Sequence, residues 1–92
     1  MSLNFEWDPR KDNSNRRKHH VSFSEAATAF ADPLSITQPD PDHSAPENRF
    51  LLVGLSACGR LLVVSHAERG DNIRIISARL ATSRERETYE ED

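Results

Sequence analysis

The chain has 92 residues and a formal net charge of −3, which is enough for one domain and too little for two, so we expect a single domain over residues 1–92. Its only cysteine, Cys58, excludes an internal disulfide, and its four histidines form no metal-binding motif, so we expect neither a metal nor a cofactor. No signal-like N-terminus and no apolar run of about 18 residues is present, which indicates a cytoplasmic protein without membrane contact.

The N-terminal segment predicts a short strand and a polar helix. Apolar and polar residues alternate over residues 4–7, which is typical of an edge strand. Asp8 and Pro9 then form a typical helix start, because aspartate can accept a hydrogen bond from an unpaired backbone N–H and proline has no N–H to leave unpaired. We expect a helix over about residues 9–18 that has almost no apolar face and either meets solvent or covers a polar surface.

A second helix is predicted after a capping box. The Ser22 hydroxyl can accept a hydrogen bond from the backbone N–H of Glu25, while the Glu25 carboxylate reaches back to the helix start. Apolar residues then recur at helical spacing to about Ala31. Residues 34–37 suit a short strand, and the proline-rich segment 38–48 predicts a loop.

The second half predicts a sheet and a last helix. Three β-rich runs cover residues 49–55, 60–66 and 72–79. Their short connections indicate an antiparallel meander, because parallel neighbours need a crossover of about a dozen residues or more. Thr82 and Glu85 form another capping box, which opens a C-terminal helix to about Tyr89. We therefore expect an α+β fold, an antiparallel sheet of three to four main strands with two N-terminal helices and one C-terminal helix packed on it.

The charges are distributed unevenly along the chain. Residues 84–92 carry two arginines against five acidic residues, and the other 83 residues balance ten basic against ten acidic residues. Between residues 10 and 18, five basic residues face a single aspartate. The acidic total argues against a simple electrostatic grip on nucleic acid, but a local basic patch can exist on an acidic protein.

Taken in order, the residues resemble the BrnT family of toxins over nearly the whole chain. In the first half the resemblance lies in Phe5-Glu6-Trp7-Asp8-Pro9-x-Lys11, Asn15-x-x-Lys18-His19-x-Val21-Ser22-Phe23, Ala26-Ala27 and Phe30-x-Asp32-Pro33. In the second half it lies in Arg49-Phe50, Gly54-Leu55-Ser56, Gly59 to Val64, Glu68 to Arg79, Ala81, Glu85 and Tyr89. The chain departs from the family at His20, where glycine is common, and in its acidic total charge.

This resemblance implies a fold related to the RelE-like ribonuclease toxins. It also implies the toxin component of a type II toxin–antitoxin system, an endoribonuclease that cleaves RNA without a metal. A cognate antitoxin with a ribbon-helix-helix domain would neutralise it, and DNA would be contacted only through that antitoxin. The alternative is a catalytically silent module that binds the antitoxin and tunes promoter repression, which the acidic net charge favours slightly.

Metal-free RNA cleavage needs a base for the 2′-hydroxyl, a cation for the phosphorane charge and an acid for the leaving 5′-oxygen. The candidate cations are Arg69, Arg74 and Arg79, and His66 or Glu68 is the candidate for proton transfer. Alternation along a strand puts Arg74 and Arg79 on opposite faces unless a bulge intervenes. Cleavage requires these groups to converge in one cleft, whereas binding alone allows them to be scattered over a sheet face.

Candidates for RNA binding are Lys18, His19 and Tyr89, and each has a plainer interpretation. Lys18 and His19 can complement the negative end of the helix dipole, and Tyr89 can anchor the last helix. Arg79 can likewise form an ion pair with Glu85 or another carboxylate. His66 can be a polar residue at a strand end, and residues 68–71 can be an ordinary hairpin turn.

Overall fold

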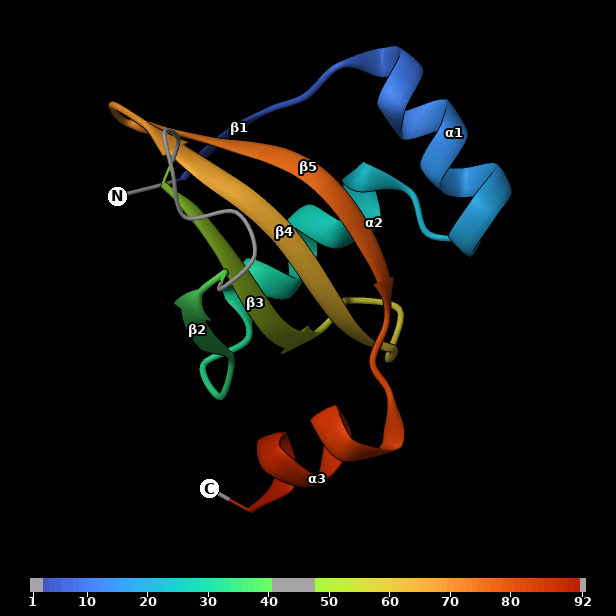
Figure 1. Ribbon diagram of the computed structural model, residues 1–92, viewed down its shortest axis with the longest axis vertical. Helices are drawn as coiled ribbons and strands as arrows, with labels where there is room; N and C mark the ends of the chain where they lie inside the picture. The colour runs from blue at the N-terminus through green and yellow to red at the C-terminus, as the bar shows by residue number, and fades with distance from the viewer. Residues whose placement is uncertain (1–2, 41–47, 92) are drawn as a thin grey trace.

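The computed structural model describes residues 3–40 and 48–91 and contains one mixed sheet with three α-helices around it (Figure 1). The elements in chain order are β1 (Asn4–Glu6), α1 (Pro9–His19), α2 (Phe23–Thr28), the 3₁₀ turn η1 (Ala29–Ala31), β2 (Ile36–Pro39), β3 (Arg49–Leu55), β4 (Leu61–Arg69), β5 (Asn72–Leu80) and α3 (Ser83–Glu90). None of the helices among these residues has the length and apolar character that crossing a bilayer requires.

The sheet confirms the α+β class but differs from the expected sheet in size and pairing. Its strand order is β1-β5-β4-β3-β2, in which β1 is parallel to β5 and the other pairs are antiparallel. The expectation of three to four antiparallel strands was therefore wrong. The pairing of β1 with β5 joins opposite ends of the chain, so no turn between them signals it. The expected strand at 34–37 lies at 36–39, and residues 41–47 of the expected loop are outside the described residues.

Local capping chemistry sets the helix starts largely as expected. Asp8 accepts a hydrogen bond from the Arg10 N–H at 2.9 Å, and α3 has the complete capping box of Thr82 and Glu85. At α2 only one half of the expected box is present, because the Glu25 carboxylate turns to another partner. It accepts hydrogen bonds from the Arg60 guanidinium and from the Ser56 hydroxyl, an interaction between segments far apart in sequence.

The hydrophobic core lies on the sheet face that α2 covers, which we call the core face. Seven buried residues form its centre: Val21, Phe23, Ala26, Leu62, Val64, Ile75 and Ala78. Burying a large apolar side chain of this kind contributes about 1.5–3 kcal/mol. Phe5, Trp7, Ala27 and Phe30 pack around them. The segment from Val21 to Phe30, which contains α2, thus packs on one side of the sheet.

The opposite face of the sheet, which we call the open face, is only partly covered by α3. In Figure 1, β3, β4 and β5 run side by side through the centre, α1 lies beyond the β5 edge, and α3 lies past the end of β5. Strand register and alternation place thirteen residues of the three central strands on the open face: Arg49, Leu51, Val53, Leu55, Leu61, Val63, Ser65, Ala67, Arg69, Asn72, Arg74, Ser77 and Arg79.

Candidate functional site

A β-bulge in β5 brings Arg74 and Arg79 onto the same face of the sheet. Ser77 pairs with Ser65 and Ile75 pairs with His66, so Ile76 is an extra residue with no partner on β4. Arg74 then lies opposite Ala67 and Arg79 opposite Val63. Ala67 and Val63 are four positions apart along β4, so both share one face, and the strand positions of the two arginines are about 13 Å apart. The structure thus contains the β-bulge without which Arg74 and Arg79 would lie on opposite faces of the sheet.

Small side chains line the sheet between the two arginines. Ser65 and Ser77 form the pair halfway between them, and Ala67 lies beside Arg74. Arg49 lies opposite Ala67 on β3, so it belongs to the same cross-strand row as Arg74. Sequence reasoning did not single out Arg49, because its place depends on the register of β3. The open face therefore carries these three arginines, and the side chains of the sheet between them are small.

Arg74 is held by a carboxylate from the N-terminal strand. Its Nη1 lies 3.0 Å from Oε2 of Glu6, and Nδ2 of Asn72 donates to Oε1 of Glu6 at 3.0 Å. The hydrogen bonds from Asn72 and Arg74 lower the pKa of Glu6, so this carboxylate is charged at neutral pH. Arg69, at the end of β4, also favours the charged form of Glu6. Glu6 was not predicted as a site residue, since the β1–β5 pairing brings it here.

Arg79 forms the ion pair with Glu85 that its plainer interpretation predicted. Its Nη1 and Nη2 atoms lie 2.8 and 2.9 Å from the two carboxylate oxygens of Glu85. These hydrogen bonds lower the pKa of Glu85 to about 2 and raise the pKa of Arg79. The Arg79 side chain remains 41% exposed, so the guanidinium is still accessible from solvent. The pair also joins the start of α3 to the end of β5.

His66 lies on the core face, away from the arginines. It is 3% exposed and sits between two phenyl rings, with centroid distances of 4.8 Å to Phe30 and 5.9 Å to Phe50. Its Nδ1 lies 3.2 Å from the carbonyl oxygen of Val64. Burial lowers the pKa of His66 and favours the neutral ring. The structure therefore does not bring His66 to the arginines, because strand alternation after Ser65 turns it into the core.

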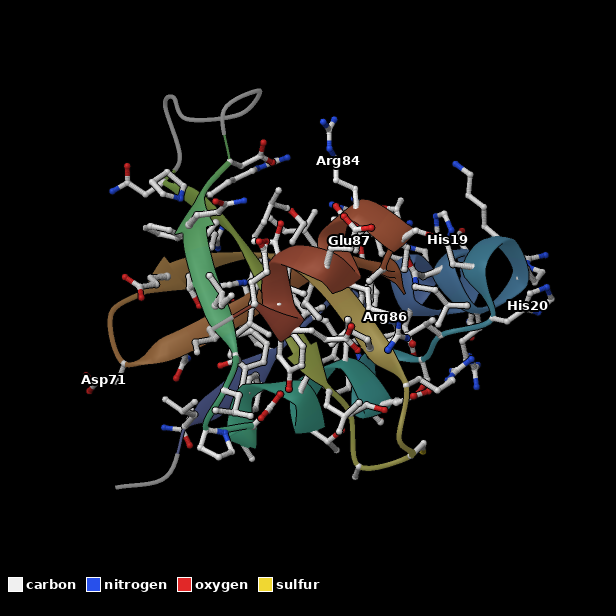
Figure 2. All side chains as sticks on the ribbon, turned by 90° about the horizontal axis from the view of Figure 1, so that it is seen from below. His19, His20, Asp71, Arg84, Arg86 and Glu87 are labelled. Atoms are coloured by element: carbon white, nitrogen blue, oxygen red, sulfur yellow. The ribbon has the colours of Figure 1, made fainter. Side chains whose placement is uncertain are left out.

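The remaining candidates are spread over the molecule. Glu68 is exposed at the β4–β5 hairpin and alternates to the side of His66, so it does not join the arginines either. His19 ends α1, and Figure 2 shows it at the opposite end of the molecule from Asp71 of that hairpin. Lys18 precedes His19 in the last turn of α1, where both complement the helix dipole.

Tyr89 anchors the end of α3. Its hydroxyl donates a hydrogen bond to Oδ2 of Asp32 at 2.6 Å, and this bond to a carboxylate raises the pKa of Tyr89. Together with the Arg79–Glu85 pair, it fastens both ends of α3 over the open face. The plainer interpretation of Tyr89 as an anchor agrees with these contacts. Among the residues that the structure describes, no cluster of three or more histidine, cysteine or carboxylate side chains could hold a metal ion.

Comparison with known proteins agrees with this architecture. The family model of the ribonuclease toxin BrnT of type II toxin–antitoxin systems matches residues 7–85. A comparison with curated proteins gives no match. The fold is similar to that of the ribonuclease toxin BrnT of Brucella abortus, with a TM-score of 0.68 and 19% identity over 89% of this chain and 100% of that chain. Since the family match spans most of the sequence, this chain belongs to the BrnT family of ribonuclease toxins of type II toxin–antitoxin systems.

Proposed function

We propose that this chain is an endoribonuclease toxin that binds RNA on the open face and cleaves it without a metal. The observation that carries the proposal is that the bulge at Ile76 puts Arg74 and Arg79 on the same face of the sheet. Arg49 and Arg69 add positive charge to the same face of a chain whose net charge is −3. Guanidinium groups bind phosphate through paired hydrogen bonds, so these arginines can supply the positive charge that phosphoryl chemistry needs.

The proton carriers on this face are the carboxylates of Glu6 and Glu85. Both accept hydrogen bonds from arginines that we propose to bind phosphate. Their pKa values are lowered by those arginines, so each is a weak base while the ion pair is intact. When a phosphate binds the guanidinium in place of the carboxylate, the carboxylate loses the hydrogen bonds from arginine that lower its pKa. That pKa then rises toward its ordinary value. Substrate binding would in this way create a base next to the 2′-hydroxyl, and the proton that the carboxylate takes would pass to the leaving 5′-oxygen as the bond from phosphorus to that oxygen breaks. His66 and Glu68 have no place in this version of the mechanism.

The partner that type II membership implies is an antitoxin. The family resemblance supports an antitoxin with a ribbon-helix-helix DNA-binding domain, through which alone the complex would contact DNA. The open face is where neutralisation would act most directly, because a partner covering it would block the arginines. A cytoplasmic location, where RNA and antitoxin are both present, is part of the same proposal.

A second candidate function is a catalytically silent module that binds the antitoxin and tunes promoter repression. The observation in its favour is that Arg74 and Arg79 are already paired with carboxylates, while the buried His66 lies on the other face. A face whose charges are mutually neutralised suits protein binding as well as catalysis. The two candidates differ in what the chain does when it is expressed without a partner.

The test is induction of the chain alone in a bacterial host, with growth and total RNA integrity as readouts. The wild type, Arg74→Gln and Arg79→Gln are compared with Arg17→Gln, a control on the exposed surface of α1. The nuclease proposal expects growth arrest and RNA loss from the wild type and the control, relieved by either open-face variant. Soluble, folded wild type that leaves growth and RNA intact would favour the silent module. Arrest that both variants preserve would place the chemistry elsewhere.

A further inference from the structure

A cavity of about 210 Å³ lies between α3 and the open face, next to the proposed catalytic arginine. Its floor is apolar and includes Leu51, Val53 and Val63 of the sheet. Its rim includes the amide of Gln38 on β2 and the side chain of Arg84 at the start of α3. An apolar floor with a few polar groups at the edge is the usual composition of a small-molecule site.

The cavity and the Arg79–Glu85 pair are directly connected. Val63 on the cavity floor is the cross-strand partner of Arg79. Glu85 lines the cavity and also accepts both hydrogen bonds from the Arg79 guanidinium. A group lying in the cavity is therefore one residue away from a phosphate held by Arg79. This adjacency is what a nucleotide needs, since its base and its phosphate are joined by a single ribose.

The charges at the mouth of the cavity suit a phosphodiester chain. Figure 2 shows the Arg84 side chain extending from α3 away from the ribbon. Within the part of the chain that the structure describes, Arg84 makes no ion pair, so its guanidinium is available to an incoming anion. Arg84 in the lining of the cavity and Arg79 beside its lining residue Glu85 could each bind one of the two neighbouring phosphates of a nucleotide.

The volume of the cavity and the polar groups at its rim indicate which kind of molecule fits it. Sites for drug-sized molecules measure roughly 300–1,000 Å³, so this cavity takes a single ring system and is too small for a dinucleotide or a partner helix. A base offers flat apolar faces to the floor, and the Gln38 amide can both donate to and accept from its edge. Proteins that recognise single-stranded RNA commonly hold unstacked bases in this manner. An apolar side chain of a protein partner would leave the Gln38 and Arg84 groups unused.

We propose that this cavity receives one nucleobase of a single-stranded RNA, beside the phosphate bound by Arg79. The inference rests on the proposed ribonuclease function, because it concerns the same RNA strand. It makes the cavity the part of the site that selects which base lies at the cut. Its experiments are chosen so that base binding and RNA cleavage are measured separately.

The first experiment measures base binding without cleavage. The full chain is titrated with each of the four nucleoside 5′-monophosphates, and NMR follows the methyl groups of Leu51, Val53 and Val63. Ribose 5-phosphate is the control that carries the same phosphate without a base. We expect saturable methyl shifts with at least one nucleotide and none with the control. Equal shifts with ribose 5-phosphate would mean a simple anion site and would overturn the inference.

The second experiment fills the cavity. Val53→Phe places a ring on the cavity floor, while Leu55→Phe adds the same ring two residues along β3, where the side chain is 42% exposed and outside the cavity. We expect Val53→Phe to weaken nucleotide binding roughly tenfold or more, as loss of base contacts does, and to change the distribution of cut sites in sequenced RNA ends. Leu55→Phe should change neither. If Val53→Phe does not fold, Gln38→Leu at the exposed rim replaces it, with the same expected loss.

The outcomes separate this inference from the proposed function. RNA cleavage with no nucleotide shifts, or with cut sites that Val53→Phe leaves unchanged, would keep the nuclease and overturn the base site. Nucleotide shifts without any cleavage would support the base site and contradict the nuclease. Loss of antitoxin binding in Val53→Phe with unchanged nucleotide affinity would show that a protein side chain occupies the cavity, and would overturn the inference.

Discussion

The side-chain amide of Asn15 completes the hydrogen bonding of Ala78 at the edge of β5. Its Nδ2 donates to the Ala78 carbonyl oxygen at 2.8 Å, and its Oδ1 accepts from the Ala78 N–H at 3.1 Å. The parallel pairing of β1 with β5 ends at Arg74, so beyond the bulge this amide stands where a neighbouring strand would be. Nδ2 also donates to the Val21 carbonyl at 2.9 Å. One buried side chain thus joins α1, the segment before α2, and the residue next to Arg79.

Replacing Asn15 should destabilise the protein strongly. Asn15→Leu leaves the N–H and the carbonyl of Ala78 and the carbonyl of Val21 without this partner, and each buried group left unpaired costs about 1–3 kcal/mol. We expect the free energy of unfolding in urea to fall by about 3–5 kcal/mol. Asn13→Ala, on the exposed side of the same helix, should change it by about 0.5 kcal/mol or less. A loss below about 1 kcal/mol in Asn15→Leu would mean that water replaces the amide.

Replacing His20 by glycine should stabilise the protein. His20 ends α1 in the left-handed region, with φ 59° and ψ 33°, where glycine is the residue that fits without a steric cost from Cβ. A side chain costs about 1–2 kcal/mol there, and the greater freedom of glycine in the unfolded chain offsets part of the gain. We expect His20→Gly to raise the free energy of unfolding by about 0.5–1 kcal/mol. His20→Ala keeps Cβ and should show no gain; equal stabilisation by both variants would contradict this explanation.

The features that could be predicted from sequence have local causes. The cap at Asp8, the box at Thr82 and the strands of the meander each depend on residues within a few positions of one another. The Arg79–Glu85 pair also falls within six residues. Such local patterns can be recognised without knowing how the rest of the chain folds. They were sufficient for the α+β class and for the order of the main elements.

The features that were missed depend on contacts between distant segments. Glu6 reaches Arg74 only because β1 pairs in parallel with a strand 68 positions later. Glu25 turns away from its capping box because Arg60 offers a stronger, charged partner. Whether Arg74 joins Arg79 was undecidable from alternation alone, since one extra residue at Ile76 reverses the answer.

The burial of His66 predicts a pH dependence of stability and no role in cleavage. Its pKa is lowered in the folded state, so its contribution to stability is fully present above about pH 6.5 and is lost as the pH falls through the lowered folded value. His66→Phe keeps a ring between Phe30 and Phe50 and should remove that dependence, measured as urea midpoints on both sides of pH 6.5. RNA cleavage by this variant should persist. Loss of RNA cleavage in a folded His66→Phe variant would mean that His66 takes part in the reaction.

The attachment of α3 should depend on the charge of Glu85. Arg79 lowers the pKa of Glu85 from 4.5 to about 2, so the stabilisation is fully present above about pH 4.5 and is lost as the pH falls through about 2. The Arg79 and Glu85 side chains are 41% and 28% exposed, and solvent screening limits the pair to about 1 kcal/mol or less. Glu85→Gln keeps a capping side chain but not the charge, and should loosen α3 at neutral pH.

Glu87→Gln is the matched control on the same helix, because Glu87 is exposed and lies on α3 as Figure 2 shows. NMR titration of the Glu85 carboxyl group in the wild type and in Glu87→Gln, with the amide shifts of α3 followed in parallel, measures the effect. We expect Glu85 to titrate with a pKa of about 2 in both proteins, and the α3 shifts to move with it. High salt should bring the pKa of Glu85 closer to 4.5, since partly exposed ion pairs are screened. A pKa of Glu85 at its ordinary value in the wild type would mean that the Arg79–Glu85 pair does not persist in solution, and that Tyr89 and Asp32 alone fasten α3.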